Sequence, residues 1–177
     1  MTNDVRIRIL SVDDHPLLRE GIGAIVNCQP DMSLAGVASK GTEAIEAFRA
    51  LQPDVTLMDL RLPDLNGLDV LMAIRSEFPE ARIIVLTMFE RDAEIQRAFK
   101  AGARGYLLKS MPAQQMIETI RQVHAGWKSV PAEIAAGLAE HFGDETLSER
   151  EIPQGPPKTG HRWPLQNRPT INRDPGR

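Results

Sequence analysis

The chain lacks the features that cross-link a protein outside the cytoplasm or hold it in a membrane. Cys28 is the only cysteine among the 177 residues, so no disulfide can form within the chain. The longest apolar runs, such as residues 83–86, are a few residues long, whereas a membrane-spanning helix needs about 20. Residues 1–4 lack the basic start and apolar stretch of a secretory signal. We therefore expect a protein of the reducing cytoplasm that does not associate with membranes.

Histidine is also scarce, and the composition is otherwise that of a folded domain. Hydrophobic residues make up 42% of the chain and charged residues 25%, which argues against a disordered, collagenous or coiled-coil protein. No zinc site is expected, because metal-ligand spacing is absent from the four histidines, His15, His124, His141 and His161.

The net charge of −3 is divided unequally along the chain. Residues 153–177 hold five basic residues, one acidic residue and six of the 13 prolines, which leaves a charge of −7 for the first 152 residues. The only large apolar side chains of this segment are Trp163, Leu165 and Ile171, too few to offset the entropy of ordering it. We therefore predict that residues 153–177 are disordered.

Two hydrophobic periods alternate along the first part of the chain. Short apolar runs, mostly rich in β-branched residues, predict buried strands at residues 5–12, 33–38, 55–60, 82–88 and 105–108. The intervals, and the stretch after the last run, carry apolar residues at helical spacing, such as Leu18, Ile22 and Ile25. Five strands that alternate with five helices predict a doubly wound α/β domain, a parallel sheet with helices on both faces, over residues 5–126.

Polar side chains stand where the predicted strands end, which is the edge where such sheets bind ligands. Asp13 and Asp14 follow the first strand, Asp59 lies at the end of the third, Thr87 at the end of the fourth, and Lys109 follows the fifth. Each of them alone would usually be a turn former, a strand residue or a solvated surface residue. Together they place three carboxylates, a hydroxyl and an ammonium at one edge.

This combination of groups predicts phosphoryl chemistry that depends on a metal ion. Crowded carboxylates repel one another, and a hard divalent cation with oxygen ligands relieves the repulsion, so Mg²⁺ is the expected cofactor. Asp59 beside Mg²⁺ and Lys109 is a competent nucleophile toward phosphorus, which predicts an aspartyl phosphate. Thr87 and Lys109 would then bind phosphoryl oxygens.

Three strings resemble the receiver domain of bacterial two-component response regulators. They are Ser-Val-Asp-Asp-His-Pro at residues 11–16, Leu-Met-Asp-Leu-Arg-Leu-Pro-Asp-Leu-Asn-Gly at residues 57–67, and Gly-Tyr-Leu-Leu-Lys at residues 105–109. The resemblance implies a flavodoxin-like sheet with strand order 2-1-3-4-5. It also implies these site residues: phosphoacceptor Asp59, switch pair Thr87 and Tyr106, active-site lysine Lys109, and Mg²⁺ ligands Asp13, Asp14, Asp59 and the backbone carbonyl of Arg61.

The resemblance further implies how such a protein works. A sensor histidine kinase transfers the phosphoryl group from its phosphohistidine to Asp59, and hydrolysis later restores the carboxylate. The protein is then a switch with weak self-phosphorylation and autodephosphorylation rather than an enzyme, in which Thr87 moves toward the phosphoryl group and Tyr106 turns inward. We expect a homodimer on phosphorylation.

Gly67 also matches the family, and we expect it to permit an unusual backbone before the third helix.

The C-terminal part resembles only the beginning of an output domain. An amphipathic stretch with Ile134, Leu138 and Phe142 predicts a linker helix within residues 127–146. Residues 147–151 resemble the opening of a LuxR-type helix-turn-helix domain, a module of about 60 residues that binds DNA. Only 27 residues follow Arg150, and they lack an apolar helical period. We expect residues 147–177 to be a truncated helix-turn-helix and a disordered tail, produced by a shift of the reading frame near Ile152. A basic arm that binds nucleic acid is the less favoured alternative for this tail.

Other functions fit the residues less well. A flavodoxin-like cofactor binder needs a phosphate loop rich in Gly, Ser or Thr after the first strand, where this chain has Asp13 and Asp14. A haloacid-dehalogenase-like phosphatase places its nucleophile there in an Asp-x-Asp pattern, which is absent. A phosphorylation-independent interaction module is less favoured because every residue of the acceptor site is present.

Overall fold

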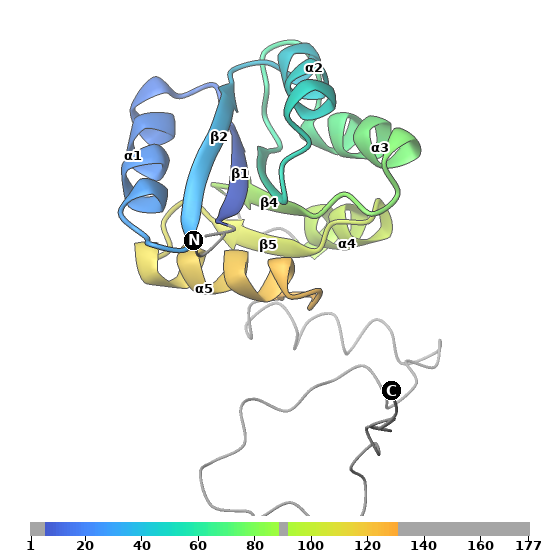
Figure 1. Cartoon of the computed structure of the whole chain (residues 1–177). Helices are drawn as coiled ribbons and strands as arrows, with labels where there is room; N and C mark the ends of the chain where they lie inside the picture. The colour runs from blue at the N-terminus through green and yellow to red at the C-terminus, as the bar shows by residue number, and fades with distance from the viewer. Residues whose placement is uncertain (1–5, 89–91, 131–177) are drawn as a thin grey trace, which may run out of the picture. The chain divides into compact units, whose positions relative to one another are not determined.

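A computed structural model describes residues 6–88 and 92–130 of the chain. The predictions for the linker helix beyond residue 130 and for residues 147–177 lie outside the described residues. The strands are β1 (Ile7–Val12), β2 (Met32–Ala38), β3 (Val55–Asp59), β4 (Ile83–Thr87) and β5 (Gly105–Leu108). The helices are α1 (Pro16–Asn27), α2 (Gly41–Leu51), α3 (Gly67–Glu77), α4 (Asp92–Lys100) and α5 (Ala113–His124). Strands and helices alternate as the sequence predicts (Figure 1).

The five strands form one parallel sheet in the order β2-β1-β3-β4-β5, which confirms the predicted fold class and strand order. Val12 of β1 pairs with Met58 of β3, and Asp59 pairs with Leu86 of β4. Since the strands are parallel, their carboxyl ends meet at the same edge of the sheet. The residues that follow β1, β3, β4 and β5 are therefore neighbours in space.

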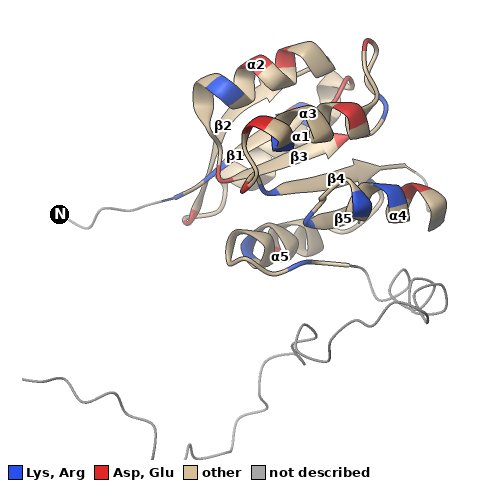
Figure 2. Cartoon of the chain, turned by 90° about the vertical axis from the view of Figure 1, so that its right-hand side faces the viewer, with Lys and Arg blue, Asp and Glu red and all other residues tan. Residues whose placement is uncertain are grey.

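The helices cover both faces of the sheet, as expected from their apolar stripes. Helices α2, α3 and α4 contribute to one core cluster, which includes Phe48, Leu71 and Ile95. Helices α1 and α5 contribute to the other cluster, which includes Ile22 and Ile120. Figures 1 and 2 show these two layers on either side of the strands. Strands β3 and β4 are thus buried from both sides, which explains their continuous apolar runs, whereas the edge strand β2 is only partly buried.

Local residue choices set where the helices begin and end. Pro16 is the first residue of α1, where its missing N–H costs no hydrogen bond. The Asn66 side chain caps α3 by accepting a hydrogen bond of 2.9 Å from the backbone N–H of Leu68. Gly102 follows α4 with φ +99°, and Gly126 follows α5 with φ +95°. These left-handed conformations favour glycine and turn the chain after each helix.

Gly67 is required for a different reason from the one that the sequence predicts. Positive φ values among the described glycines occur only at Gly102 and Gly126, so the prediction of an unusual backbone at Gly67 is wrong. A Cβ at Gly67 would instead lie 2.0 Å from the backbone oxygen of Asp59. The N–H of Gly67 donates to the carbonyl of Leu60 at 2.9 Å. Glycine therefore allows the start of α3 to approach the end of β3.

The chain returns to the sheet after α5. The N–H of Ser129 donates to the carbonyl of Arg104 at 2.9 Å, and the N–H of Tyr106 donates to the carbonyl of Ser129 at 3.3 Å. Ser129 thereby forms an isolated parallel bridge with Gly105 at the outer edge of β5. The first residues of the predicted linker, residues 127–146, are thereby tied to the strand that carries Tyr106. Within the described part of the chain, no helix has the length and apolar character needed to cross a membrane.

Candidate functional site

Lys109 lies between two buried carboxylates at the carboxyl edge of the sheet. Its backbone N–H donates to the carbonyl of Thr87 at 2.7 Å, which fixes the residue directly after β5. Its Nζ lies 2.7 Å from Oδ2 of Asp13 and 2.7 Å from Oδ2 of Asp59. The Lys109 side chain is 5% exposed, and Asp13 and Asp59 are 0% and 3% exposed. One ammonium therefore compensates two acids that are removed from water.

The remaining contacts of these acids come from the loops that follow β1 and β3. Oδ1 of Asp13 accepts a hydrogen bond of 2.9 Å from the N–H of His15, and Oδ1 of Asp59 accepts one of 3.2 Å from the N–H of Arg61. The Arg19 guanidinium donates to the carbonyl of Asp13 and so ties the first loop to α1. Oδ2 of Asp13 accepts no directed hydrogen bond, although the Lys109 ammonium contacts it. The acids therefore retain lone pairs that a cation can use.

The group of possible metal ligands is larger than the sequence predicts. Ligand atoms of Asp13, Asp14, His15 and Asp59 all lie within 4.8 Å of one another. The three carboxylates offer the hard oxygen ligands that Mg²⁺ prefers, so the residues present fit this ion. The zinc-spacing criterion does not identify His15, because it considers only how histidines are spaced from one another. Its position next to two consecutive aspartates was the signal that could have found it.

Burial and ion pairing shift the ionisation of the central pair. Burial raises the pKa of Asp59, and the hydrogen bonds from Lys109 and from the Arg61 N–H offset this only in part. Burial alone lowers the pKa of Lys109, but its interactions with Asp13 and Asp59 outweigh burial, so the pKa is raised. The lysine therefore stays charged at neutral pH, beside a carboxylate that is more basic than an exposed aspartate.

The predicted switch residues lie on the two neighbouring strands β4 and β5. Thr87 is the last residue of β4 and is buried at the same edge as Lys109. Tyr106 pairs in register with Val85 of β4 and is fully buried. It belongs to the core cluster on the α2, α3 and α4 side of the sheet, together with Ile95 of α4. The aromatic ring thus lies inside the domain in this structure.

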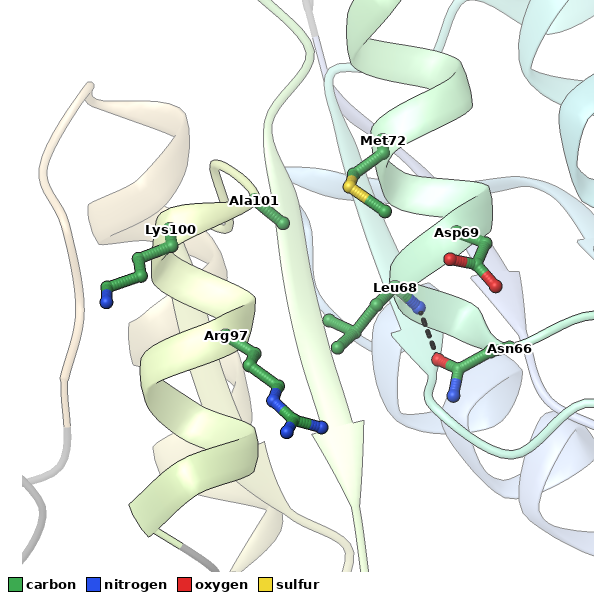
Figure 3. A pocket seen from close by; sticks show the side chains of 7 residues that line it. All are labelled: Asn66, Leu68, Asp69, Met72, Arg97, Lys100 and Ala101. Atoms are coloured by element: carbon green, nitrogen blue, oxygen red, sulfur yellow. Dashed lines mark hydrogen bonds between the residues drawn. The ribbon is translucent and has the colours of Figure 1, made fainter.

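A separate groove of about 460 Å³ lies between α3 and α4 (Figure 3). It is lined by Asn66, Leu68, Asp69, Met72, Arg97, Lys100 and Ala101. Arg97 and Lys100 are the basic residues in the last turn of α4, a helix that carries both blue and red segments in Figure 2. None of the predicted site residues lines this groove, so the candidate site is the acidic cluster and not this hollow.

Comparisons with known proteins agree with this arrangement. Residues 9–121 match the family described as the response regulator receiver domain. The nitrate/nitrite response regulator protein NarL of Escherichia coli (strain K12) is 33% identical over 159 residues, which cover 89% of this chain and 74% of that protein. The response regulator GacA of Pseudomonas aeruginosa is 35% identical over 154 residues, which cover 82% of this chain and 72% of that protein.

Solved structures show the same similarity. A two-component response regulator of the LuxR family from Aurantimonas sp. superposes with a TM-score of 0.74 at 34% identity, over 78% of this chain and 99% of that one. The response regulator domain of Thermotoga maritima CheB superposes with a TM-score of 0.64 at 33% identity, over 68% of this chain and 97% of that one. The family match covers most of the described sheet and helices, including the acidic edge. The chain therefore belongs to the response regulators of two-component systems and contains their receiver domain.

Proposed function

We propose that Asp59 accepts a phosphoryl group from the phosphohistidine of a sensor histidine kinase in a reaction that requires Mg²⁺. The observation that carries this proposal is the position of the Lys109 ammonium, 2.7 Å from both Asp13 and Asp59 at the carboxyl edge of the sheet. Asp59 supplies a buried nucleophile, and Lys109 supplies a fixed positive charge within hydrogen-bond distance of it. Response regulators are signalling switches rather than classical enzymes, and the self-phosphorylation and autodephosphorylation that we propose are accordingly weak.

The proposed transfer forms one bond and breaks one. A carboxylate oxygen of Asp59 attacks phosphorus, the P–N bond to the kinase imidazole breaks, and the imidazole leaves with the electron pair and takes up a proton. Asp13, Asp14, Asp59 and the backbone carbonyl of Arg61 would hold Mg²⁺, which when bound supplies charge neutralisation for the phosphoryl oxygens.

The residues around Asp59 have separate roles in this proposal. Lys109 transfers its hydrogen bond from the Asp59 carboxylate to a phosphoryl oxygen, and the Thr87 hydroxyl donates to another. Because Asp13 keeps its contact with Lys109, the ammonium remains anchored after the exchange. Burial of Asp13, Asp59 and Lys109 excludes water from one side of the acyl phosphate and thereby slows its hydrolysis.

The switch would connect the site with the segment after α5. Movement of Thr87 toward the phosphoryl group would change the packing around Tyr106, whose backbone N–H donates to Ser129. A conformational bias of about 3 kcal/mol would change the populations of two states more than a hundredfold. Homodimerisation on phosphorylation and control of transcription are the outputs that we propose; the second is supported by a relative that is named a transcriptional regulatory protein. Within this scheme residues 5–126 are the receiver domain and residues 127–146 a linker, and the location that we propose is the cytoplasm.

The test is phosphorylation by a small donor. The full chain is incubated with Mg²⁺ and acetyl phosphate, and intact-mass measurement is expected to show the gain of one phosphoryl group that hydroxylamine removes. Asp59→Asn should abolish the gain, whereas Asp69→Asn, an exposed acid of α3, should leave it unchanged. A gain that persists in Asp59→Asn would refute the assignment. Chromatography with light scattering, before and after phosphorylation, tests the dimer.

A further inference from the structure

His15 turns its side chain toward the acidic cluster although it is largely exposed. The side chain is 68% exposed, yet Nδ1 lies 2.7 Å from Oδ1 of Asp14 and 3.2 Å from Oδ1 of Asp13. His15 occupies the N-cap position of α1, where a polar side chain commonly accepts a hydrogen bond from the helix. Its side chain makes no such bond. The imidazole is therefore available to the cluster rather than engaged in capping the helix.

The backbone holds the imidazole in this place. Pro16 begins α1 directly after His15 and restricts the conformation of the residue before it. The carbonyl of His15 accepts a hydrogen bond of 3.1 Å from the N–H of Arg19, and the Arg19 guanidinium binds the carbonyl of Asp13. The loop that carries Asp13, Asp14 and His15 is thus fixed to the first turn of α1 at two points.

Without a cation these separations are hydrogen-bond distances between the imidazole and the two carboxylates, and they are also close to the spacing of ligands that share one metal ion. Ligand atoms about 2.1 Å from an octahedral ion lie about 3.0 Å apart at adjacent corners and about 4.2 Å apart at opposite corners. The two Nδ1 separations, 2.7 and 3.2 Å, lie on either side of the adjacent-corner value. All the ligand atoms of the cluster lie within 4.8 Å of one another, a range slightly larger than the opposite-corner value.

We propose that Nδ1 of His15 is a ligand of the divalent cation site, and that this nitrogen shifts the preference of the site from Mg²⁺ toward later transition ions such as Ni²⁺. Imidazole nitrogen suits ions such as Ni²⁺, whereas Mg²⁺ favours an all-oxygen shell that includes several waters. The proposal depends on the proposed function only for the position of the cation beside Asp14 and Asp59. His15 would then set which metal supports the switch.

Pulsed electron paramagnetic resonance of Mn²⁺ bound to the untagged full chain tests this proposal directly. A directly bound imidazole is expected to give ¹⁴N modulation of the Mn²⁺ signal. His15→Phe should remove the modulation, and His124→Gln, in the last turn of α5, should not change it. His15→Asn provides a second variant, because asparagine is a favoured N-cap that preserves the start of α1.

Calorimetric titration of the same proteins measures the preference. His15→Phe and His15→Asn should weaken Ni²⁺ binding by about tenfold or more, since even mutations of the groups that surround metal ligands reduce metal affinity by about 10- to 100-fold. The same variants should change Mg²⁺ binding by less than about threefold. Tight Mn²⁺ binding without ¹⁴N modulation, or equal losses for Ni²⁺ and Mg²⁺, would overturn the role of His15 while leaving the acidic site intact. Failure of the proposed function would look different, because Asp59→Asn would then alter neither cation binding nor phosphorylation.

Discussion

Replacing Lys109 by methionine should destabilise the domain strongly, because it removes the positive charge from between two buried acids. Methionine retains an unbranched side chain of similar length, so packing changes little. The Lys109 side chain is 5% exposed and its Nζ lies 2.7 Å from both Asp13 and Asp59. Removing one partner from a buried ion pair costs about 3–5 kcal/mol. Since one acid can take up a proton in response, we expect a loss of about 3 kcal/mol at pH 7.

The pH dependence of this loss separates an electrostatic cause from a packing defect. Without Lys109 the compensation of burial is lost and the pKa of Asp59 rises further, so its protonated form stabilises the fold relative to the ionised form. The loss should therefore grow as the pH rises above neutrality and shrink toward about pH 4, where carboxyl groups bind protons in the unfolded chain as well.

Urea unfolding in the presence of a chelator, followed by circular dichroism from pH 4 to pH 8, measures the effect. Lys100→Met, at an exposed lysine of α4, is the matched control and should change stability by less than about 0.5 kcal/mol. Adding Asp59→Asn to Lys109→Met should restore part of the loss, because one of the two uncompensated acids is then neutral. A loss below about 1 kcal/mol at pH 7, or one that does not change with pH, would contradict the ion-pair explanation.

Three further outcomes follow from single contacts. Burial raises the pKa of Asp59, so the protonated acid stabilises the fold below its unfolded pKa, and this contribution is lost as the pH rises through the folded pKa. Urea titrations should therefore show that Asp59→Asn gains stability relative to the wild type over that rise in pH. A gain that does not depend on pH would argue against burial as the cause. Gly67→Ala should cost about 1–3 kcal/mol, because its Cβ would lie 2.0 Å from the carbonyl oxygen of Asp59, and an unchanged urea midpoint would show that α3 yields freely. Asp64→Ala should lower the melting temperature, because Asp64 accepts hydrogen bonds from the backbone N–H of Gly41 at 2.6 Å and of Thr42 at 3.0 Å. Those bonds hold the pKa of Asp64 far below its usual range. The stabilisation of the fold by ionised Asp64 is therefore present above the unfolded pKa and is lost only as the pH falls through the folded pKa. Equal melting temperatures of wild type and variant at pH 4, measured by calorimetry, would contradict this.

The alternation of strands and helices could be predicted because it depends on local periodicity. Apolar runs such as residues 83–86 mark strands that are buried on both faces, and the observed β4 extends one residue beyond this run, to Thr87. The predicted strand ends differ from the observed ones by one or two residues, because end residues such as Leu60 are apolar whether or not they pair. A parallel sheet brings all carboxyl ends to one edge, so the approach of Asp13, Asp59 and Lys109 follows from topology.

Other features depend on side-chain directions and loop paths that no local pattern encodes. The contact of His15 with Asp14 exists because the first turn of α1 holds the loop after β1. The need for glycine at residue 67 arises because α3 approaches the end of β3. The pairing of Ser129 with β5 requires α5 to direct the chain back to the sheet edge. The sequence by itself predicted the fold class from its periodicity, and the family from the strings at residues 11–16, 57–67 and 105–109, which also place the acidic residues at the ends of strands. Only the tertiary structure decided which atoms meet there, because distances of 2.7 Å depend on how helices separated along the chain pack against the sheet.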